Sequence, residues 1–527
     1  MSINATADSA PPAAPALLEQ PPPPRLSLAR VLIAVLVLAC VGVTAAYAIK
    51  RPSAGSSRTS ASVFAPYVDV TLTPTYAFQD PIANPVQRVV LGFIVAQPSH
   101  GCTPSWGGYY SLSQAEIALN LDQRVTQVRS QGGVATISFG GQANTELAVG
   151  CDSVQALSAA YLDVLQRYHV ASADFDIEGS ALANAPANAR RATAVALLQR
   201  RIVAGGGHLR VWLTLPVTPS GLTASGLTVI RQMLAAHVRL AGVNVMAMDF
   251  PLTHAVQTNM IGAVESSLAH AHDQLVVLDQ HAHLASGSAA VWSQLGVTVM
   301  IGQNDVANEI FTVKDARALA TFVDAQRLAQ VSVWSLNRDS ECGGAFAQVG
   351  VVSNSCSGVT QTPLQFTHIF SSLPGTVTAD TRQASAIPQV TSTTVDNPAT
   401  SPYPVWQFSA AYPAGYKVVW HHAVYEAMWF AQGQAPNTPV TGAGQTPWLL
   451  LGPVLAGEHA PTPTLLTGSV KQTWSMSAAY RTGDRVLFDG LPFEAKWYSQ
   501  GATPDTGLPQ SPQSPWLPLF TIPGEPR

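Results

Sequence analysis

The chain has 527 residues, of which 47% are hydrophobic and only 11% are charged, and its formal net charge is −4. An ordinary soluble protein has about 25% charged residues, so this chain has enough apolar material for large cores and is not, as a whole, a charge-driven disordered protein. The negative balance and the lack of a Lys- or Arg-rich run exclude nucleic-acid binding that is driven by charge along the whole sequence.

The N-terminus predicts export. Residues 1–30 form a disordered tail that is rich in Pro and Ala. Residues 31–49 contain no charge, and their length favours a transmembrane anchor over a signal-peptide core of about 7–15 residues. The small-residue pattern Ala46-Tyr47-Ala48 favours cleavage instead. Segment 31–49 is therefore either a signal peptide or a single anchor, and both place the rest of the chain outside the cytoplasm.

The cysteines agree with export. Besides Cys40 there are Cys102, Cys151, Cys342 and Cys356, and four cysteines allow three pairings. Their spacing matches no zinc pattern, so disulfides in an oxidising compartment are the better interpretation. Proximity in the sequence favours Cys342–Cys356, which leaves Cys102 to pair with Cys151.

Residues 62–374 alternate short β-branched apolar runs with longer stretches of helical period. The expected strands are 64–72, 88–97, 134–140, 171–178, 209–217, 243–250, 297–303 and 331–337, and the expected helices include 113–131, 153–168, 187–204, 227–241 and 313–328. Continuous apolar strands separated by helices indicate an α/β fold with a parallel sheet, and eight of them fit a (β/α)8 TIM barrel. A doubly wound open sheet is the alternative, although no Gly-rich dinucleotide turn follows the first strands. Residues 275–278 are left open between strand and helix.

A linker over residues 375–401 leads to an internal repeat. Eleven landmarks recur at a constant offset of 68 positions, from Trp406 and Trp474 to Trp448 and Trp516. Such constancy indicates two copies of one small module, at 402–454 and 471–520, with a linker at 455–470 between them. Each copy is too small for a large core, so we expect small β-rich modules that depend on their aromatic residues.

The sharpest chemical pattern is Asp174-Phe175-Asp176-Ile177-Glu178 at the end of the fourth expected strand. Alternate residues of a strand share a face, so the three carboxylates line up on one side and Phe175 and Ile177 on the other. Inward residues at this end of a barrel strand form active sites, and crowded carboxylates raise the pKa of at least one member. The pattern predicts a general acid, with a solvated acidic strand or a bound cation as the alternative.

These motifs resemble glycoside hydrolase family 18, the chitinases. The pattern D-x-D-x-E is similar to the family signature, Ser138-Phe139-Gly140-Gly141 to its S-x-G-G, and Met246-Ala247-Met248-Asp249 to its M-x-Y-D. Trp334, on the eighth expected strand, takes the place of the family's sugar-platform tryptophan. The resemblance spans about 310 residues, and its motifs follow the order of the strands.

The resemblance implies retaining, substrate-assisted hydrolysis of β-1,4-linked N-acetylglucosamine polymers. Glu178 would act as acid and base, Asp176 would hold the substrate's acetamido group, and Asp174 would orient Asp176. The substrate-binding residues that the resemblance implies are Ser138, Gly140, Gly141, Met248, Asp249, Phe250 and Trp334.

The sequence departs from the family at Met248, which replaces a tyrosine whose hydroxyl contacts the acetamido oxygen. Loss of one such donor typically costs 10²–10³ in rate, so activity is still expected. A weak or inactive chitin-binding protein is the rival hypothesis. A third hypothesis keeps catalysis but takes the chitobiose core of glycans as substrate.

The two repeats resemble small chitin- and cellulose-binding modules of families 5 and 12, with Glu426–Phe430 and Glu494–Tyr498 as their signature. The resemblance implies that Trp429, Phe430, Trp497 and Tyr498 stack on sugar rings, whereas Trp406, Tyr412, Trp474 and Tyr480 are expected in the cores. The expected partner is chitin or its oligosaccharides, with no nucleic acid, cofactor or metal. We expect a monomer that is secreted or anchored at the outer face of the cytoplasmic membrane.

Overall fold

The computed structural model describes residues 61–250, 256, 259–282, 287–343, 352–377, 395–440, 443–459, 472–504, 514–521 and 524. The predicted tail, the segment 31–49 and most of both predicted linkers lie outside these residues. Among the residues that are described, no helix is both long enough and apolar enough to cross a membrane.

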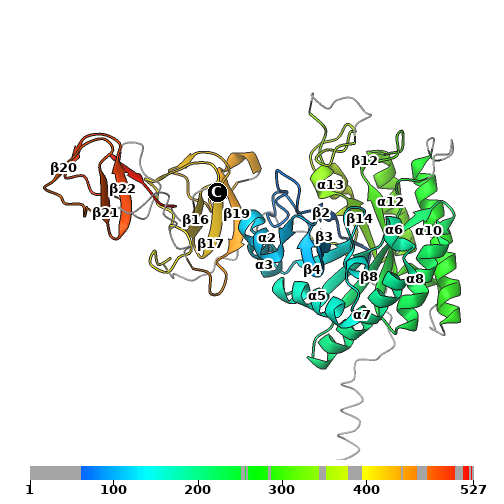
Figure 1. Ribbon diagram of the computed structural model, residues 1–527. Coiled ribbons are helices and arrows are strands. Elements are labelled where there is room, and N and C mark those ends of the chain that lie inside the picture. The colour runs from blue at the N-terminus through cyan, green and yellow to red at the C-terminus, as the bar shows by residue number, and fades with distance from the viewer. Residues whose placement is uncertain are drawn as a thin grey trace, which may run out of the picture. The chain divides into compact units, whose positions relative to one another are not determined.

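Parallel strands form the centre of the first region (Figure 1). The neighbouring parallel strands are, in spatial order, β1 (Val63–Phe64), β14 (Gln330–Trp334), β11 (Leu295–Met300), β10 (Leu240–Met246), β8 (Arg210–Thr218), β7 (Ser172–Asp176), β6 (Val134–Gly140) and β3 (Arg88–Gln97). Antiparallel β4 (His100–Trp106) and β5 (Tyr110–Ser111) continue from β3, and β9 (Gly221–Leu222) pairs with β8. Strands β7 and β11 are buried along their whole length, as the apolar runs predict.

The first predicted strand is interrupted. Val63–Phe64 (β1) pairs with β14, whereas Tyr67–Asp69 (β2) pairs with β3 at the other end of the parallel order. Pro66 lies between the two pieces and has no N–H to donate, although its carbonyl accepts a hydrogen bond of 2.8 Å from the Val90 N–H. One short segment therefore contributes to both ends of the row of parallel strands.

Helices lie around these strands (Figure 1). The longer ones are α2 (Leu112–Leu119), α3 (Leu121–Ser130), α5 (Val154–Arg167), α7 (Ala185–Ala204), α8 (Ala224–Ala235), α10 (Met260–His281) and α12 (Val313–Gln326). The shorter ones are α4 (Leu147–Gly150), α6 (Gly179–Leu182), α11 (Ser288–Trp292), α13 (Gln365–Phe370) and the 3₁₀ turn η1 (Leu336–Arg338). The expected helix 113–131 is two helices, because Asn120 adopts a left-handed conformation with φ 53° between them. The open stretch 275–278 belongs to α10.

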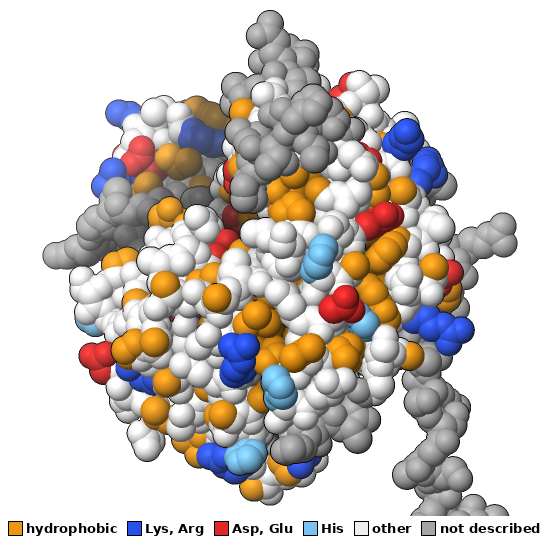
Figure 2. Space-filling view, turned by 90° about the vertical axis from the view of Figure 1, so that its right-hand side faces the viewer, with side chains coloured by type: hydrophobic (Ala, Val, Ile, Leu, Met, Phe, Trp, Pro, Cys, Tyr) orange, Lys and Arg blue, Asp and Glu red, His pale blue; other side chains and the backbone are white. Residues whose placement is uncertain are grey.

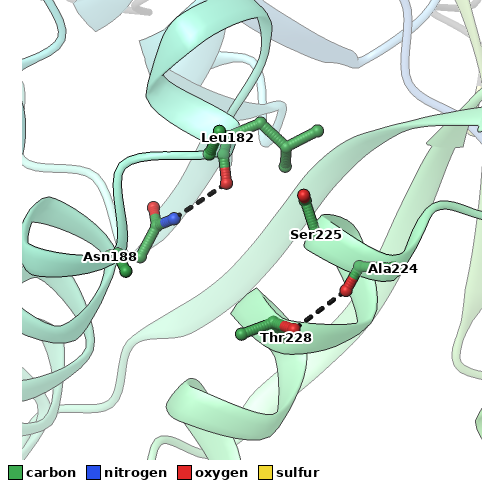
Figure 3. Close-up of a pocket in the computed structure, with 7 residues that line it drawn as sticks. Leu182, Asn188, Ala224, Ser225 and Thr228 are labelled. Carbon is green, nitrogen blue, oxygen red and sulfur yellow. Dashed lines mark hydrogen bonds between the residues drawn. The ribbon is translucent and has the colours of Figure 1, made fainter.

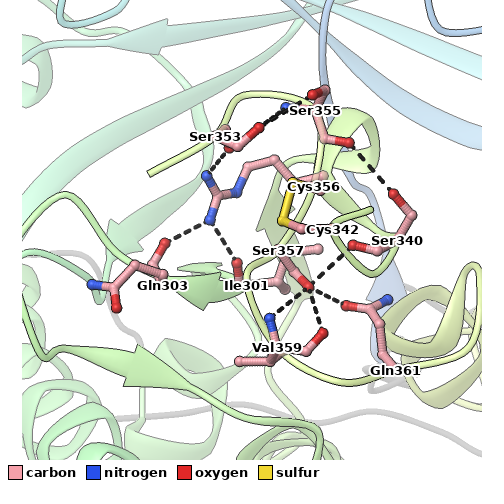
Figure 4. The surroundings of a disulfide bond; sticks show 11 residues. Ile301, Gln303, Ser340, Cys342, Ser353, Ser355, Cys356, Ser357, Val359 and Gln361 are labelled. Carbon is pink, nitrogen blue, oxygen red and sulfur yellow. Dashed lines mark hydrogen bonds between the residues drawn. A yellow bond between two sulfur atoms is a disulfide. The ribbon is translucent and has the colours of Figure 1, made fainter. Parts of the chain in front are cut away.

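Both predicted disulfide pairings are confirmed. The Cα atoms of Cys102 and Cys151 are 4.5 Å apart, and those of Cys342 and Cys356 are 5.1 Å apart. Figure 4 shows the second disulfide among serine side chains, where the Ser357 hydroxyl donates to the Ser340 carbonyl oxygen at 3.2 Å. Within the described ranges, no cluster of three His, Cys, Asp or Glu residues could hold a metal ion.

The repeat in the sequence is a repeat in the structure. The first copy contains β15 (Ala411–Tyr412), β16 (Lys417–Trp420), β17 (Ala423–Ala427), β18 (Ala431–Gln432), the 3₁₀ turn η3 (Ala443–Gln445) and β19 (Trp448–Pro453). The second contains β20 (Ala479–Tyr480), β21 (Arg485–Phe488), β22 (Leu491–Ala495), β23 (Ser499–Gln500) and β24 (Trp516–Pro518). The buried hydroxyl of Tyr412 accepts from the Gln407 N–H at 2.7 Å, and Tyr480 repeats this bond with Ser475 at 2.6 Å. The aromatic residues at equivalent positions thus close the same small fold twice.

The small share of charged residues is visible on the surface. Figure 2 shows the side of the molecule on which α8, α10 and α12 lie in Figure 1, and there the charged side chains are scattered among apolar and neutral polar ones. This mixture agrees with the small share of charged residues in the sequence.

Candidate active site

Strand β7 directs its first carboxylate into the space between the strands. Asp174 is 2% exposed and accepts three hydrogen bonds: at Oδ2 from the Ser138 hydroxyl of β6 (2.7 Å) and the Tyr67 hydroxyl of β2 (2.9 Å), and at Oδ1 from the Thr214 hydroxyl of β8 (2.6 Å). Burial raises the pKa of Asp174, while these three donors lower it. Strands that are distant in the sequence thus fix one buried carboxylate.

The opposite face of β7 is a helix-packing face, as the alternation predicts. Phe175 lies 5.4 Å from Phe139 and 5.1 Å from Tyr161 of α5, measured between ring centroids. The division between carboxylates and apolar residues on this strand is confirmed.

The polar group around Asp174 extends to residues that the sequence patterns did not single out. Asn244 of β10 donates from Nδ2 to the hydroxyl oxygens of Thr298 (2.6 Å) and Thr214 (3.1 Å), and more weakly to that of Tyr67 (3.4 Å). All of these side chains are buried. The available signal was a single polar residue inside an otherwise apolar strand, which is costly to bury without a partner.

The two glycines of the S-x-G-G motif allow close backbone approaches. A Cβ on Gly140 would lie 1.9 Å from the Asp176 carbonyl oxygen, and one on Gly141 would lie 2.8 Å from the Phe93 ring. Both have positive φ angles, of 112° and 84°, that other residues rarely adopt. These glycines therefore position the strand ends around the acids, while their predicted contact with substrate stays a prediction.

The carboxyl groups of Asp176 and Glu178 are close enough for each to affect the pKa of the other. Burial raises the pKa of Asp176 well above its ordinary value, and the neighbouring Glu178 and Asp174 carboxylates raise it further. Burial also raises the pKa of Glu178, to about 7, and the Asp249 carboxylate adds to this shift. Glu178 stands at the strand end, directly before α6, and is half-buried. A carboxyl group that keeps its proton near neutral pH at the end of a buried strand can act as a general acid.

An aromatic group lies beside these acids. Trp334, the last residue of β14, is half-buried and stacks on Phe93 with 5.4 Å between ring centroids, and its ring lies 6.2 Å from Tyr67. Because Tyr67 also binds Asp174, the tryptophan and the acids belong to one neighbourhood. Phe93 was not predicted, since the sequence gives it no motif.

The M-x-Y-D-like residues follow β10. Met246 and Met248 are half-buried, Phe250 is 1% exposed, and Asp249 reaches the surface. The Asp249 carboxylate accepts a bond of 3.2 Å from the Val306 N–H and contributes to the electrostatics of Glu178. Phe250, predicted to bind substrate, is enclosed in the core instead.

A separate pocket of about 190 Å³ opens where α6 meets α7 and α8 (Figure 3). Two of its polar side chains are engaged within the fold: Asn188 donates to the Leu182 carbonyl oxygen at 3.0 Å, and Thr228 donates to that of Ala224 at 2.9 Å. The residues that line it are Leu182, Ala183, Ala185, Asn188, Ala224, Ser225 and Thr228. The predicted acids are not among them.

The aromatic pairs of the two modules are exposed to matching degrees. Trp429 and Trp497 are each 43% exposed, and Phe430 and Tyr498 are each 62% exposed. Trp406, Tyr412 and Tyr480 are buried and Trp474 is partly buried, so the predicted core positions are confirmed. Sugar binding by the exposed rings stays a prediction.

Comparisons relate the chain to chitinases by sequence. No protein-family profile matches it. A probable bifunctional chitinase/lysozyme of Escherichia coli (strain K12) is 34% identical over 286 residues, which are 53% of this chain and 31% of that protein. Endochitinase 11 of Metarhizium anisopliae is 32% identical over 284 residues, 53% of this chain and 52% of that protein. Among solved structures, the catalytic domain of a hyperthermophilic chitinase from Pyrococcus furiosus aligns with 59% of this chain and 93% of its own, at 26% identity and a TM-score of 0.49. The chain thus spans about a third and about half of the two curated relatives.

Proposed function

We propose that residues 62–374 form a (β/α)8 barrel of glycoside hydrolase family 18 that hydrolyses chitin. The interrupted first strand supports the barrel, because β1 and β2 pair with opposite ends of the parallel row. The sequence similarity to two chitinases supports the substrate.

One observation carries the proposal. A fully buried Asp174 and a buried Asp176 lie on β7, and a half-buried Glu178 with a pKa of about 7 follows directly after this strand, beside a half-buried tryptophan. A structural ion-pair network would pair these carboxylates with cations. Here hydroxyl groups and neighbouring carboxylates surround them instead.

The arrangement suits substrate-assisted hydrolysis. Glu178 gives its proton to the glycosidic oxygen as the bond to the anomeric carbon breaks. The acetamido carbonyl oxygen of the same sugar then bonds to that carbon, and Asp176 accepts a hydrogen bond from the acetamido N–H and stabilises the positive charge. Water attacks the anomeric carbon and loses its proton to the Glu178 carboxylate while the bond from that carbon to the acetamido oxygen breaks, which regenerates the acetamido group and releases a product of retained configuration.

The two C-terminal repeats are proposed as chitin-binding modules on the strength of their exposed aromatic pairs. Two tethered modules raise the effective concentration of the enzyme on an insoluble polymer. Export remains a proposal that rests on the N-terminal sequence and on the two disulfides.

Glu178→Gln tests the catalytic assignment. We expect kcat on chitin oligosaccharides to fall by about 10²–10⁴, because the amide cannot donate a proton as an acid does. Binding of the inactive variant to the same oligosaccharides should persist. Unchanged hydrolysis would refute the assignment, and a wild-type protein that binds chitin but releases no soluble product would support the rival binding-protein hypothesis.

A further inference from the structure

Two carboxylates hold the turn after β10 and the loop after β11 against each other. The Asp249 carboxylate accepts a hydrogen bond of 3.2 Å from the Val306 N–H of the loop. In return, Glu309 Oε2 accepts a bond of 2.9 Å from the Phe250 N–H of the turn. Each acid thus binds the backbone on which the other is carried.

The turn needs such support. Asp249 has a φ angle of 50°, in the left-handed region that non-glycine residues enter at a cost, and this conformation persists only where the surroundings over-determine it. Glu309 supplies part of that determination, because its carboxylate accepts a hydrogen bond from the N–H of Phe250, the residue directly after Asp249.

The loop does not need the Glu309 side chain for its own closure. The Asn304 N–H donates to the Glu309 carbonyl oxygen at 2.9 Å, and Asn304 Nδ2 donates to the Met300 carbonyl oxygen at 2.9 Å. Backbone and asparagine bonds therefore close the loop, which lies between β12 (Gly302–Gln303) and β13 (Ile310–Phe311). The Glu309 carboxylate is directed at the turn.

Burial of the Glu309 carboxyl group at this position costs free energy. Glu309 is only 1% exposed, and its second oxygen, Oε1, has no hydrogen-bond partner among the described residues. Burial raises its pKa to about 7, and the Asp249 carboxylate adds to the rise. Burial of a carboxyl group with one bare oxygen costs free energy that an apolar residue of similar size avoids, so fold stability alone does not account for it.

The turn matters because Asp249 is the strongest charged neighbour of Glu178. After burial, the Asp249 carboxylate is the largest cause of the raised pKa of Glu178. The charged or titratable groups that face Glu178 and this turn are Asp174 and Asp176 of β7, Tyr67 of β2, Asp305 and Glu309 of the loop, and Arg338 of η1. Arg338 opposes the acids and is itself fixed by the carbonyl oxygens of Ile301 and Gln303.

We propose that Glu309 is a positioning residue for catalysis: its carboxylate fixes the turn that carries Asp249, and the turn places the Asp249 carboxylate near the acid, Glu178. The inference rests on the proposed function, in which Glu178 is the acid. Glu309 itself touches neither the acid nor the substrate.

A double-mutant cycle with pH profiles tests the proposal on the full chain with a soluble chitin oligosaccharide. Glu309→Leu removes the acceptor at similar volume, and we expect the alkaline limb of kcat/KM to move about one pH unit lower, with an activity loss of about fivefold at pH 7. Glu309→Gln keeps one acceptor oxygen and should restore most of the wild-type profile. In the Asp249→Asn background, Glu309→Leu should move the limb no further, because the group through which it acts is already neutral.

An equal shift of the limb in both backgrounds, or no shift with Glu309→Leu in the wild-type background, would overturn the proposal. If Glu309→Leu fails to fold, the same cycle with Glu309→Ala, which also removes the acceptor, decides, with a shift of the limb expected only where Asp249 is present. Asp305→Asn is the charge control, since it removes an exposed neighbouring carboxylate and leaves the bonds to the turn intact. Failure of the proposed function is distinguishable, because Glu178→Gln would then leave the wild-type rate unchanged.

Discussion

Removal of the Tyr67 hydroxyl perturbs the acid cluster by a single hydrogen bond. This hydroxyl donates to Asp174 at 2.9 Å and lies 2.9 Å from the Thr214 hydroxyl, inside a fully buried group. Tyr67→Phe removes this one donor and keeps the ring that packs beside Trp334. A hydrogen bond to a charged group contributes about 1.5–3 kcal/mol, against about 1 kcal/mol for a neutral pair.

The stability that Tyr67→Phe loses should depend on pH. The folded-state pKa of Asp174 is raised above its unfolded value of about 3.9, so the stability that this group contributes is largest below that value and falls as the pH rises toward the folded pKa. Because the Tyr67 donor lowers the folded pKa, its removal raises that pKa further. The variant should therefore lose about 2 kcal/mol in the free energy of unfolding at pH 8 and about 1 kcal/mol or less near pH 3.5.

Urea unfolding of the full chain at both pH values, followed through the transition of the first region, measures this difference. Tyr168→Phe is the matched control, since the buried Tyr168 hydroxyl accepts a neutral bond of 2.8 Å from the Trp106 indole. We expect the control to lose about 1 kcal/mol at either pH. Equal losses for Tyr67→Phe at pH 3.5 and pH 8 would refute the view that its hydroxyl stabilises an ionised Asp174.

Other consequences follow from the same structure. The rate constant kcat/KM should fall above a pH of about 7, where Glu178 loses its proton, and a profile flat to pH 9 would contradict its role as the acid. Trp497→Ala should weaken binding to insoluble chitin about tenfold in sedimentation assays, whereas Leu517→Ala, which removes another exposed apolar side chain of the same module, should not. Opening Cys102–Cys151, with a sequence separation of 49, by paired Ser substitutions should cost about 4 kcal/mol in urea unfolding, against about 3 kcal/mol for Cys342–Cys356, with a separation of 14. The reverse order would contradict the loop-closure account.

Periodicity and short motifs predicted much of the fold. The runs 88–97 and 134–140 match β3 and β6 to the residue, and the constant offset of the repeat reappears in every strand pair of the modules. These features are local, since an apolar run or a recurring aromatic residue needs no knowledge of distant contacts. The alternation in β7 likewise predicted that the carboxylates lie on one face of the strand and the apolar side chains on the other.

The remainder depends on contacts between distant segments. Nothing near Tyr67 in the sequence shows that its hydroxyl meets Asp174, 107 positions away, and Glu309 follows no motif. The split of the expected helix at Asn120 depends on one left-handed residue within a sequence of helical period. Phe250, expected at the substrate, is instead buried, and its N–H donates to Glu309, a residue distant in the sequence.

The configuration of the first product tests the central claim most directly. Hydrolysis of a soluble chitin oligosaccharide, followed by proton NMR within the first minutes, resolves the anomers before they equilibrate. Attack by the substrate's own acetamido group, with Asp176 beside it and Glu178 as the acid, predicts an initial excess of the β-anomer. An initial excess of the α-anomer would show that water attacks directly, and it would contradict the mechanism inferred from the acid cluster on β7.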